Sequence, residues 1–324
     1  MSEGPAPEAS ARQGLALPAA QPLALRSWLF VPGDSERKQD KALGTDADVV
    51  ILDLEDSVAP AELLRARERV SGLLRSRART PAPQLWVRVN APASGLLRAD
   101  LDAVFAGGAP GGVVLPKISA PAEITDTARY LAMLETQMGG APGSTRLLVI
   151  ATETPAGLLA LPQYPSALGG SRALLTRLAG LTWGAEDLGA ALGALRQRDA
   201  DGAPTFTFQL ARTSCLLAAA ALGVQAIDGV QADFRDAREL QHELDAARRD
   251  GFSGKLAIHP DQIAAINAAF VPSDAERAHA QRVVAAFATA PAAAGVVSLD
   301  GRMLDRPHLL QAQRILAAAR RDKR

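Results

Sequence analysis

The stretch VVILDLEDSVAP (residues 49–60) joins a continuous apolar run to a dense group of acids. Its first four residues are apolar without interruption, which is typical of a strand buried on both faces in a parallel sheet. Asp53, Glu55 and Asp56 then place three carboxylates within four positions. Carboxylates this close repel one another unless a cation or basic groups compensate their charge. The stretch therefore predicts a core strand that ends at a charged site.

Comparable apolar runs recur along the chain, and each is followed by a longer segment rich in Ala, Leu and Arg. The eight runs are residues 26–31, 48–54, 85–90, 111–117, 146–152, 181–184, 224–230 and 254–259. Segments between them, such as 61–77 and 208–223, carry apolar residues at helical spacing, and Gly223 is a suitable C-cap for the second. Eight strand–helix repeats predict a closed (β/α)8 TIM barrel rather than an open doubly wound sheet.

The chain ends differ from this repeat. Residues 1–25 are rich in Ala, Pro, Gln and Ser, which predicts a disordered leader rather than a signal peptide. No linker divides residues 26–290, so they are expected to form the barrel. Residues 291–324 predict a C-terminal turn and helix, with a hairpin-like turn at "LDGRM". A barrel closes with its eighth helix, so this extension must pack elsewhere, and covering an active site of this chain or a neighbouring subunit is one option.

Composition excludes several classes of partner. Lys plus Arg and Asp plus Glu both total 35 in 324 residues, so the formal net charge is zero. This balance argues against nucleic acid or an anionic membrane, which favour basic proteins. No apolar run reaches the roughly 20 residues that span a bilayer. The single cysteine, Cys215, forms no intrachain disulfide and is expected to be a buried structural thiol. A cytoplasmic enzyme is therefore expected.

Polar and ionisable residues gather where the predicted strands end. In a (β/α)8 barrel the C-terminal ends of all strands meet at one face, where the active site forms. This pattern by itself predicts an enzyme. The residues are Asp53, Glu55, Asp56, Arg88, Asn90, Lys117, Glu153, Glu186, Asp187, Asp228 and His259.

The acids among these residues favour a hard metal ion. Four His and one Cys make a zinc or copper cage unlikely. Mg2+ takes one or two carboxylates and fills its other positions with water and substrate oxygens. Glu153 and Asp187 each leave a short strand within a glycine-containing turn, so both are candidate ligands. The alternative is that each caps the helix that follows.

Several basic residues have two interpretations. Arg88 lies inside a barrel strand, where it binds a substrate carboxylate with both arms of its guanidinium or pairs with a carboxylate of the second strand. Both can hold in one site. Arg37, Lys38 and Lys41 occupy the first turns of a helix, an end that disfavours cations. They indicate a bound anion such as a phosphate, or a solvated helix face.

Three further residues also remain open. His259, at the end of the eighth strand, is a satisfied core residue or a substrate contact. Asp228 is a turn residue or a functional one. Asp305 opens the last helix and is a candidate for its N-cap.

Ten short motifs follow one another along the chain from Arg26 to about Ala319. They are "RSWLFVPGD", "DVVILDLEDSVAP", "VRVN", "LPK", "ETPAG", "GAEDLGA", "QAIDGVQADFRD", "GFSGKLAIHPDQI", "AFVPS" and "DGRMLDRP". Taken in this order, they resemble the citrate lyase beta-subunit-like branch of the HpcH/HpaI aldolase superfamily. The resemblance implies a (β/α)8 barrel, usually in trimers or hexamers, with Mg2+ at the C-terminal mouth and a CoA thioester of a hydroxy acid as substrate.

The resemblance also implies roles for particular residues. Glu153 and Asp187 would hold the Mg2+, and Arg88 would bind the carboxylate of the α-keto acid part. Asp305 matches an acid that a neighbouring subunit supplies, and it would protonate the enolate of the CoA product. The residues expected along the CoA are Phe30, Arg37 and Lys41, with the backbone near Ile258 and His259.

The acids of the opening stretch are expected to support this site rather than to bind the ion directly. Alternation along the strand turns Asp53 and Glu55 to the same side. They are expected to complete the outer shell of the ion, through water or through Arg88. Asp56 is expected to start the next turn.

Four functions follow from these expectations. The first is a freestanding Mg2+-dependent lyase that cleaves citramalyl-, malyl- or citryl-CoA to acetyl-CoA and an α-keto acid. The second is a malyl-CoA thioesterase, and the third is the beta subunit of a citrate lyase complex. The fourth, a barrel kept only for binding or assembly, is disfavoured because Arg88, Glu153, Asp187 and Asp305 are all present.

Overall fold

A computed structural model describes residues 25–77, 82–200, 202–290 and 295–321. The predicted disordered leader therefore lies, except for Leu25, outside the described residues. The described part of the chain contains no helix with the length and apolarity needed to cross a membrane. Cys215 is buried, as expected.

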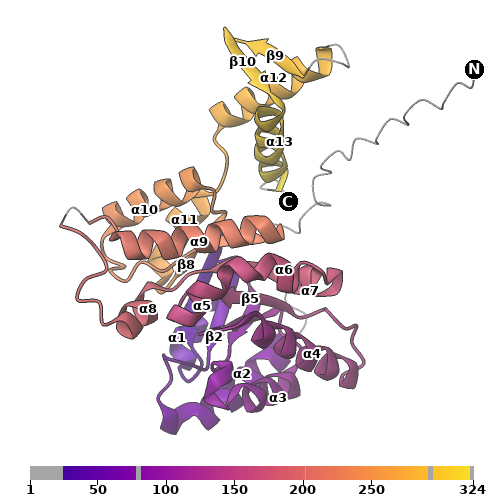
Figure 1. Cartoon of the computed structure of the whole chain (residues 1–324). Helices are drawn as coiled ribbons and strands as arrows, with labels where there is room; N and C mark the ends of the chain where they lie inside the picture. The colour runs from indigo at the N-terminus through magenta and orange to yellow at the C-terminus, as the bar shows by residue number, and fades with distance from the viewer. Residues whose placement is uncertain (1–24, 78–81, 201, 291–294, 322–324) are drawn as a thin grey trace, which may run out of the picture.

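Eight parallel strands close into a barrel in the order of the chain (Figure 1), which confirms the predicted (β/α)8 architecture. Each strand lies within or beside one of the eight apolar runs. The sixth strand begins at Leu178, three residues before the predicted run. Its start was not recognised in the sequence because Ala179 and Gly180 have little strand propensity. The strands are β1 (Ser27–Pro32), β2 (Val49–Asp53), β3 (Gln84–Arg88), β4 (Gly112–Leu115), β5 (Arg146–Ile150), β6 (Leu178–Thr182), β7 (Gln225–Asp228) and β8 (Gly254–Ala257).

Helices surround the barrel, and the two helical segments singled out in the sequence are α2 and α9. Gly223 ends α9 in the left-handed conformation with φ of 68°, as a glycine C-cap does. The helices of the barrel are α1 (Glu36–Leu43), α2 (Leu63–Arg77), α3 (Leu97–Gly107), α4 (Pro121–Gln137), α5 (Pro155–Ala160), α6 (Tyr164–Leu168), α7 (Arg172–Arg177), α8 (Ala185–Leu192), α9 (Phe206–Leu222), α10 (Ala237–Asp250) and α11 (Ile263–Ala269).

Side chains alternate along each strand between two apolar layers. Val50 and Leu52 of β2 belong to the large layer that also contains the helices. Val49 and Ile51 belong to a smaller cluster inside the barrel, where Trp28 and Trp86 pack edge to face with ring centroids 4.8 Å apart. The same alternation turns the last residues of β2 and β3 towards the barrel axis. The register of the core therefore decides which polar side chains face the mouth.

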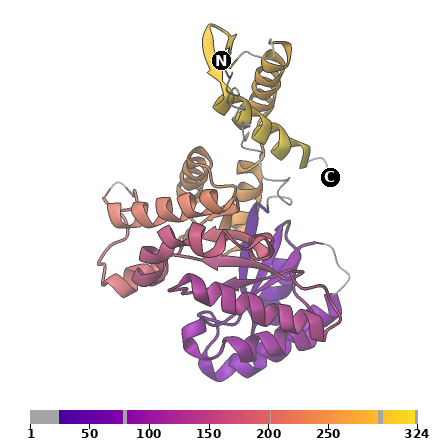
Figure 2. The same cartoon turned by 45° about the vertical axis from the view of Figure 1, so that its right-hand side comes forward.

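The C-terminal unit (residues 274–321) consists of α12 (Asp274–Thr289), a hairpin of β9 (Val296–Leu299) and β10 (Arg302–Asp305), and α13 (Arg306–Arg321). Asp300 and Gly301, with φ of 51° and 74°, form the expected hairpin turn. Figures 1 and 2 show this unit standing away from the barrel.

The C-terminal unit has a small core of its own. Its buried members are Ala280, Val283, Leu304 and Ala312. The boundary expected at residue 290 assigned α12 to the barrel, whereas its packing joins it to α13, because the apolar side of α12 faces α13 and the hairpin. The helix that follows the eighth strand and packs on the barrel is α11.

Candidate active site at the barrel mouth

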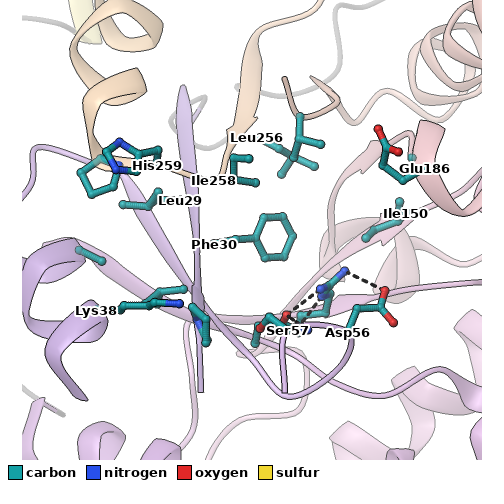
Figure 3. A pocket seen from close by; sticks show the side chains of 18 of the residues that line it. Leu29, Phe30, Lys38, Asp56, Ser57, Ile150, Glu186, Leu256, Ile258 and His259 are labelled. Carbon is teal, nitrogen blue, oxygen red and sulfur yellow. Dashed lines mark hydrogen bonds and ion pairs between the residues drawn. The ribbon is translucent and has the colours of Figure 1, made fainter. Parts of the chain in front are cut away.

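A cavity of about 660 Å³ opens at the C-terminal ends of the strands. In Figure 3, Phe30 lies between Lys38 on one side and Glu186 on the other. Twelve residues were expected to bind the metal or the substrate, to act in catalysis or to support the site, and all of them except Glu55 and Asp305 line this cavity. Of the other strand-end residues, Glu186 also lines it, whereas Asn90, Lys117 and Asp228 do not. The expected residues that line it are Phe30, Arg37, Lys41, Asp53, Asp56, Arg88, Glu153, Asp187, Ile258 and His259.

Arg88 and Asp53 form a pair in the lining of the cavity. They are direct neighbours in the register of β2 and β3. The Nε and Nη2 atoms of Arg88 donate to the two carboxylate oxygens of Asp53, at 2.7 and 2.6 Å. Burial alone would raise the pKa of Asp53, but the charge and hydrogen bonds of Arg88 hold it below its usual range. The structural pair that the sequence left open is therefore present, and it faces the cavity.

Glu55 continues the acidic group on the same side. Its Oε2 atom lies 3.1 Å from Nη1 of Arg88, and its Oε1 atom lies 2.7 Å from Nζ of Lys117. Burial raises the pKa of Glu55 to about 7 in spite of these two cations. The expectation that Asp53 and Glu55 share one side and meet through Arg88 agrees with this geometry, and Asp56 stands in the turn that follows.

Glu153 is almost completely buried at the end of β5. It does not cap α5, because Thr154 is the N-cap and accepts a hydrogen bond from the backbone N–H of Gly157 at 2.9 Å. The Oε2 atom of Glu153 instead accepts from the backbone N–H of Lys117 at 2.5 Å. Burial raises the pKa of Glu153 to about 8, and the nearby charges of Glu55 and Asp187 act in the same direction.

Gly184 makes room for Glu153, and it was not recognised in the sequence as a site residue. A Cβ atom at Gly184 would lie 2.7 Å from Cγ of Glu153, closer than carbon atoms can approach. The only signal for this constraint was the glycine in "WGAED" before the acids of α8.

Asp187 lies in the first turn of α8, after the N-cap Gly184. It therefore does not fill the capping position that was its alternative role. Its side chain is about one-third exposed, and its Oδ1 atom lies 3.3 Å from Nζ of Lys117. Since Asp187 and Glu153 line one cavity and influence each other electrostatically, both carboxylates are available to one ion.

The donor set fits Mg2+ better than a softer metal. Within the described ranges no group of three or more His, Cys, Asp or Glu side chains forms a complete metal cage. Mg2+ does not need one, because it is usually held by one or two carboxylates together with water and substrate oxygens. Burial, together with neighbouring acids, keeps the pKa values of Glu55 and Glu153 raised in spite of the local cations. A divalent ion would supply the missing charge.

The opposite side of the cavity is basic and apolar. Arg37, Lys38 and Lys41 of α1 line it together with Ile258 and His259. The imidazole of His259 accepts a hydrogen bond from the backbone N–H of Asp261 at 3.3 Å, and its ring stacks on Phe234 with centroids 4.2 Å apart. Such a wall suits a ligand that combines phosphate groups with an apolar or aromatic part.

Asp228 does not line the cavity, yet it supports a residue that does. Its Oδ1 atom accepts from Nε1 of Trp183 at 2.7 Å and from Nε of Arg212 at 2.9 Å. Lys255 lies 3.5 Å away on β8. Burial would raise the pKa of Asp228, but Lys255 and Arg212 hold it below its usual range. Trp183 itself is part of the cavity wall.

Asp305 is the one expected residue that lies away from the mouth. It ends β10 in the C-terminal unit, with its side chain half exposed and its Oδ1 atom 2.5 Å from Nδ1 of His308. It also directly precedes α13, which is the position of an N-cap residue.

A model of the HpcH/HpaI aldolase/citrate lyase family matches residues 26–260. The chain belongs to this family. That assignment confirms the resemblance seen in the sequence. The proteins that are similar to this chain include some named as a malyl-CoA thioesterase and others named as a citrate lyase subunit.

Two of these relatives and one solved structure illustrate the range. The (3S)-malyl-CoA thioesterase of Cereibacter sphaeroides is 35% identical over 301 residues, 91% of this chain and 94% of that protein. The citrate lyase subunit beta of Escherichia coli is 36% identical over 296 residues, 91% of this chain and 93% of that one. The crystal structure of protein CitE from Mycobacterium tuberculosis, in complex with magnesium, acetoacetate and coenzyme A, is 36% identical with a TM-score of 0.71, covering 91% of this chain and 98% of that chain. Magnesium, the expected cofactor, is thus bound by a solved HpcH/HpaI family relative.

Proposed function

We propose that the chain is a Mg2+-dependent CoA-ester lyase that cleaves a β-hydroxyacyl-CoA to acetyl-CoA and an α-keto acid. The observation that carries the proposal is the composition of one cavity. Glu153 and Asp187 line it on one side together with Arg88, and the basic residues of α1 line the other side. The two acids suit a metal ion, Arg88 suits a substrate carboxylate, and the basic residues of α1 suit the phosphates of CoA. The magnesium, acetoacetate and coenzyme A bound by the mycobacterial relative support this match.

Each group in the cavity has a task in this reaction. When bound by Glu153 and Asp187, the magnesium ion supplies positive charge that stabilises the negative charge developing on the substrate oxygen. Arg88 holds the carboxylate of the keto acid part and orients the bond that breaks. Its own orientation is fixed by Asp53, which binds two of its nitrogen atoms. Phe30 packs beneath the guanidinium, whose central carbon lies 4.8 Å from the ring centroid.

We assign to Asp305 the role of the acid that protonates the enolate of the CoA product. The carboxyl group of Asp305 would donate this proton to the enolate carbon as acetyl-CoA forms, and would accept it in the reverse direction. Because Asp305 does not line the cavity of its own chain, we assign it to the cavity of a neighbouring subunit. The proposal therefore includes a homo-oligomer, a trimer or a hexamer, in which the C-terminal unit reaches the next barrel.

A second candidate is hydrolysis of the thioester of malyl-CoA. The 35% identity to a (3S)-malyl-CoA thioesterase over 91% of the chain favours it. The same cavity would then deliver water to the thioester carbonyl instead of breaking the carbon–carbon bond. The third candidate, a beta subunit of a citrate lyase complex, is favoured by the similarity to the E. coli subunit. It would act on a thioester carried by a partner protein.

A substrate assay separates these candidates. The protein is incubated with Mg2+ and citramalyl-CoA, malyl-CoA or citryl-CoA, and keto acid and free CoA thiol are measured separately. Keto acid without free thiol is the result expected for the lyase. Free thiol without keto acid would assign the thioesterase. Activity only on a carrier-bound thioester would assign the complex subunit, and no product from any of these thioesters would overturn the proposal.

The control addresses the metal. Glu153→Gln keeps the size of the side chain but removes the charge that a metal ligand needs. We expect this variant to lose both Mg2+ binding in calorimetry and turnover of the substrate. EDTA is expected to inactivate the unmodified protein reversibly.

A further inference from the structure

Lys117 forms ion pairs with three acids at the barrel mouth, although no role for it was recognised in the sequence. It follows β4 and Pro116 and has φ of 51°. In the described part of the chain, only Asp300 of the hairpin turn is another non-glycine residue with positive φ. A non-glycine residue whose backbone is in this left-handed conformation costs about 1 kcal/mol or more, which the surrounding structure must offset.

The unusual backbone gives Lys117 two separate contacts with the expected metal ligands. Its backbone N–H donates to Oε2 of Glu153 at 2.5 Å. Its ammonium group lies 3.3 Å from Oδ1 of Asp187. One residue therefore orients the first carboxylate with its main chain and neutralises the second with its side chain.

The ammonium group also binds the acids of the opening stretch. Its Nζ atom donates to Oε1 of Glu55 and to Oδ2 of Asp56, each at 2.7 Å. Arg88, the other cation of this cluster, is already bound by Asp53 through two nitrogen atoms and lies beside Glu55 through the third. Among the described residues, Asp187 has an ion pair only with Lys117. This ammonium group is therefore the ion-pair partner of Asp187 in the described structure.

We propose that the ammonium group of Lys117 is a built-in cation that holds Asp187 while the metal site is free and leaves it when Mg2+ binds. The main-chain N–H of Lys117 stays on Glu153 in both states, so one ligand is kept oriented while the other is released. This inference rests on the proposed function, because it uses Glu153 and Asp187 as the magnesium ligands. It adds that Lys117 sets the affinity for the metal and stabilises the metal-free protein.

The direction of the effect follows from electrostatics. An ammonium group within a few ångströms of a divalent cation repels it, and it competes for the same carboxylate oxygen. Removing the ammonium group therefore favours the magnesium-bound state. In the metal-free state it also removes the ion pair of Asp187 and leaves Arg88 as the remaining cation beside Glu55 and Asp56. Affinity for Mg2+ and stability without Mg2+ should change in opposite directions.

The test is Lys117→Met in the full chain. Methionine keeps the length of the side chain and is no more strained than lysine at positive φ. We expect the Mg2+ dissociation constant, measured by calorimetry without substrate, to fall about tenfold, since one repelling charge is removed at short range. We expect the unfolding temperature in EDTA to fall, and the gain in unfolding temperature at saturating Mg2+ to exceed that of the unmodified protein.

Lys38→Met is the matched control, because Lys38 lines the same cavity from α1. It removes the same charge from the same cavity and is expected to change the dissociation constant less than threefold, a shift consistent with a more distant, screened charge. If Lys117→Met fails to fold in EDTA, Lys117→Gln retains a hydrogen-bond donor and is expected to show the same two shifts to a smaller extent.

Two results would overturn the inference. One is an unchanged or weaker Mg2+ affinity in both Lys117 variants. The other is an equal change in Lys117→Met and Lys38→Met, which would reduce the effect to overall charge. Failure of the proposed function is distinguishable, since it appears as absent Mg2+ binding or absent turnover in the unmodified protein, whereas failure of this inference leaves both intact.

Discussion

Arg88 donates to both carboxylate oxygens of Asp53, and the two residues stand directly opposite each other on β2 and β3. The pair is nearly buried, so neither side chain is free to turn away. Two of the three nitrogen atoms of the guanidinium are fixed in this way, and the third, Nη1, lies 3.1 Å from Oε2 of Glu55, so the guanidinium has a fixed orientation at the cavity. The substrate carboxylate is thus expected to meet a rigid partner.

Replacing the planar fork tests this relationship. Arg88→Lys keeps a positive charge but cannot bind both oxygens of Asp53, so the cation is no longer oriented. We expect kcat/KM for the acyl-CoA substrate to fall by about 100-fold or more, as for other small displacements of a positioning group. Arg67→Lys is the control, because Arg67 binds the buried Asp100 through Nε at 2.8 Å and lies outside the cavity lining. Equal activity in both variants would contradict the role of Arg88.

The close approach of Gly184 to Glu153 leads to a second prediction, a loss of Mg2+ affinity when Gly184 is enlarged. Gly184→Ala places a methyl carbon 2.7 Å from Cγ of Glu153, closer than two carbon atoms can approach, so the Glu153 side chain must move. We expect Mg2+ affinity to fall about tenfold or more with a much smaller loss of stability. Gly170→Ala is the control, since its added methyl group would have no neighbour within 4 Å. Calorimetry decides, and unchanged Mg2+ binding in Gly184→Ala would remove Glu153 from the site.

Asp305 predicts complementation between subunits. Asp305→Asn alone is expected to lose carbon–carbon bond cleavage while Mg2+ binding stays unchanged. Co-expression with Arg88→Lys is expected to restore part of the activity, because some cavities then combine an intact Arg88 with a neighbour's intact Asp305. Purification through two different tags isolates the mixed oligomers. If they are as inactive as their parents, Asp305 does not act across a subunit boundary.

The ion pairs of Asp228 lead to a prediction of how the free energy of unfolding depends on pH. Its pKa is held below the ordinary value of 3.8, because Lys255 and Arg212 outweigh the effect of burial. The stabilisation is therefore complete above pH 3.8 and is lost as the pH falls through the lower pKa of the folded protein. Asp228→Asn is expected to cost about 3 kcal/mol at pH 7, since Arg212 and Lys255 each lose one of their two charged partners, while Asp250 and Glu243 remain.

Denaturant unfolding across a range of pH measures this. The difference in unfolding free energy between the unmodified protein and Asp228→Asn should be constant from pH 7 to about pH 5 and shrink in stronger acid. A difference that grows on acidification would contradict the assigned direction of the pKa shift. Tryptophan fluorescence should change as well, because Trp183 donates to Asp228.

The barrel could be predicted from the sequence because its strands are nearly continuous apolar runs. The gathering of Asp53, Arg88 and Glu153 followed from the same fact, since parallel strands bring their C-terminal ends to one face. β6 was located less well, because Ala179 and Gly180 do not resemble a strand although they complete the ladder.

Contacts between side chains far apart in the chain were beyond the sequence. The ammonium of Lys117 meets Glu55 across 62 positions, and its positive φ depends on the surrounding fold. A lysine after a strand gives no sign of either property. The contacts of Asp228 are similar, because Trp183 and Arg212 reach it from separate elements. The position of Asp305 depends on how the C-terminal unit packs, which local pattern does not determine.

The register between β2 and β3 also limits how the chain length can vary. A single inserted or deleted residue within either strand would exchange the two faces of that strand. Arg88 or Asp53 would then point into the apolar layer beneath the helices, and an aliphatic side chain would face the cavity. Insertions and deletions among natural variants should therefore be absent from both strands and confined to the segments that connect them.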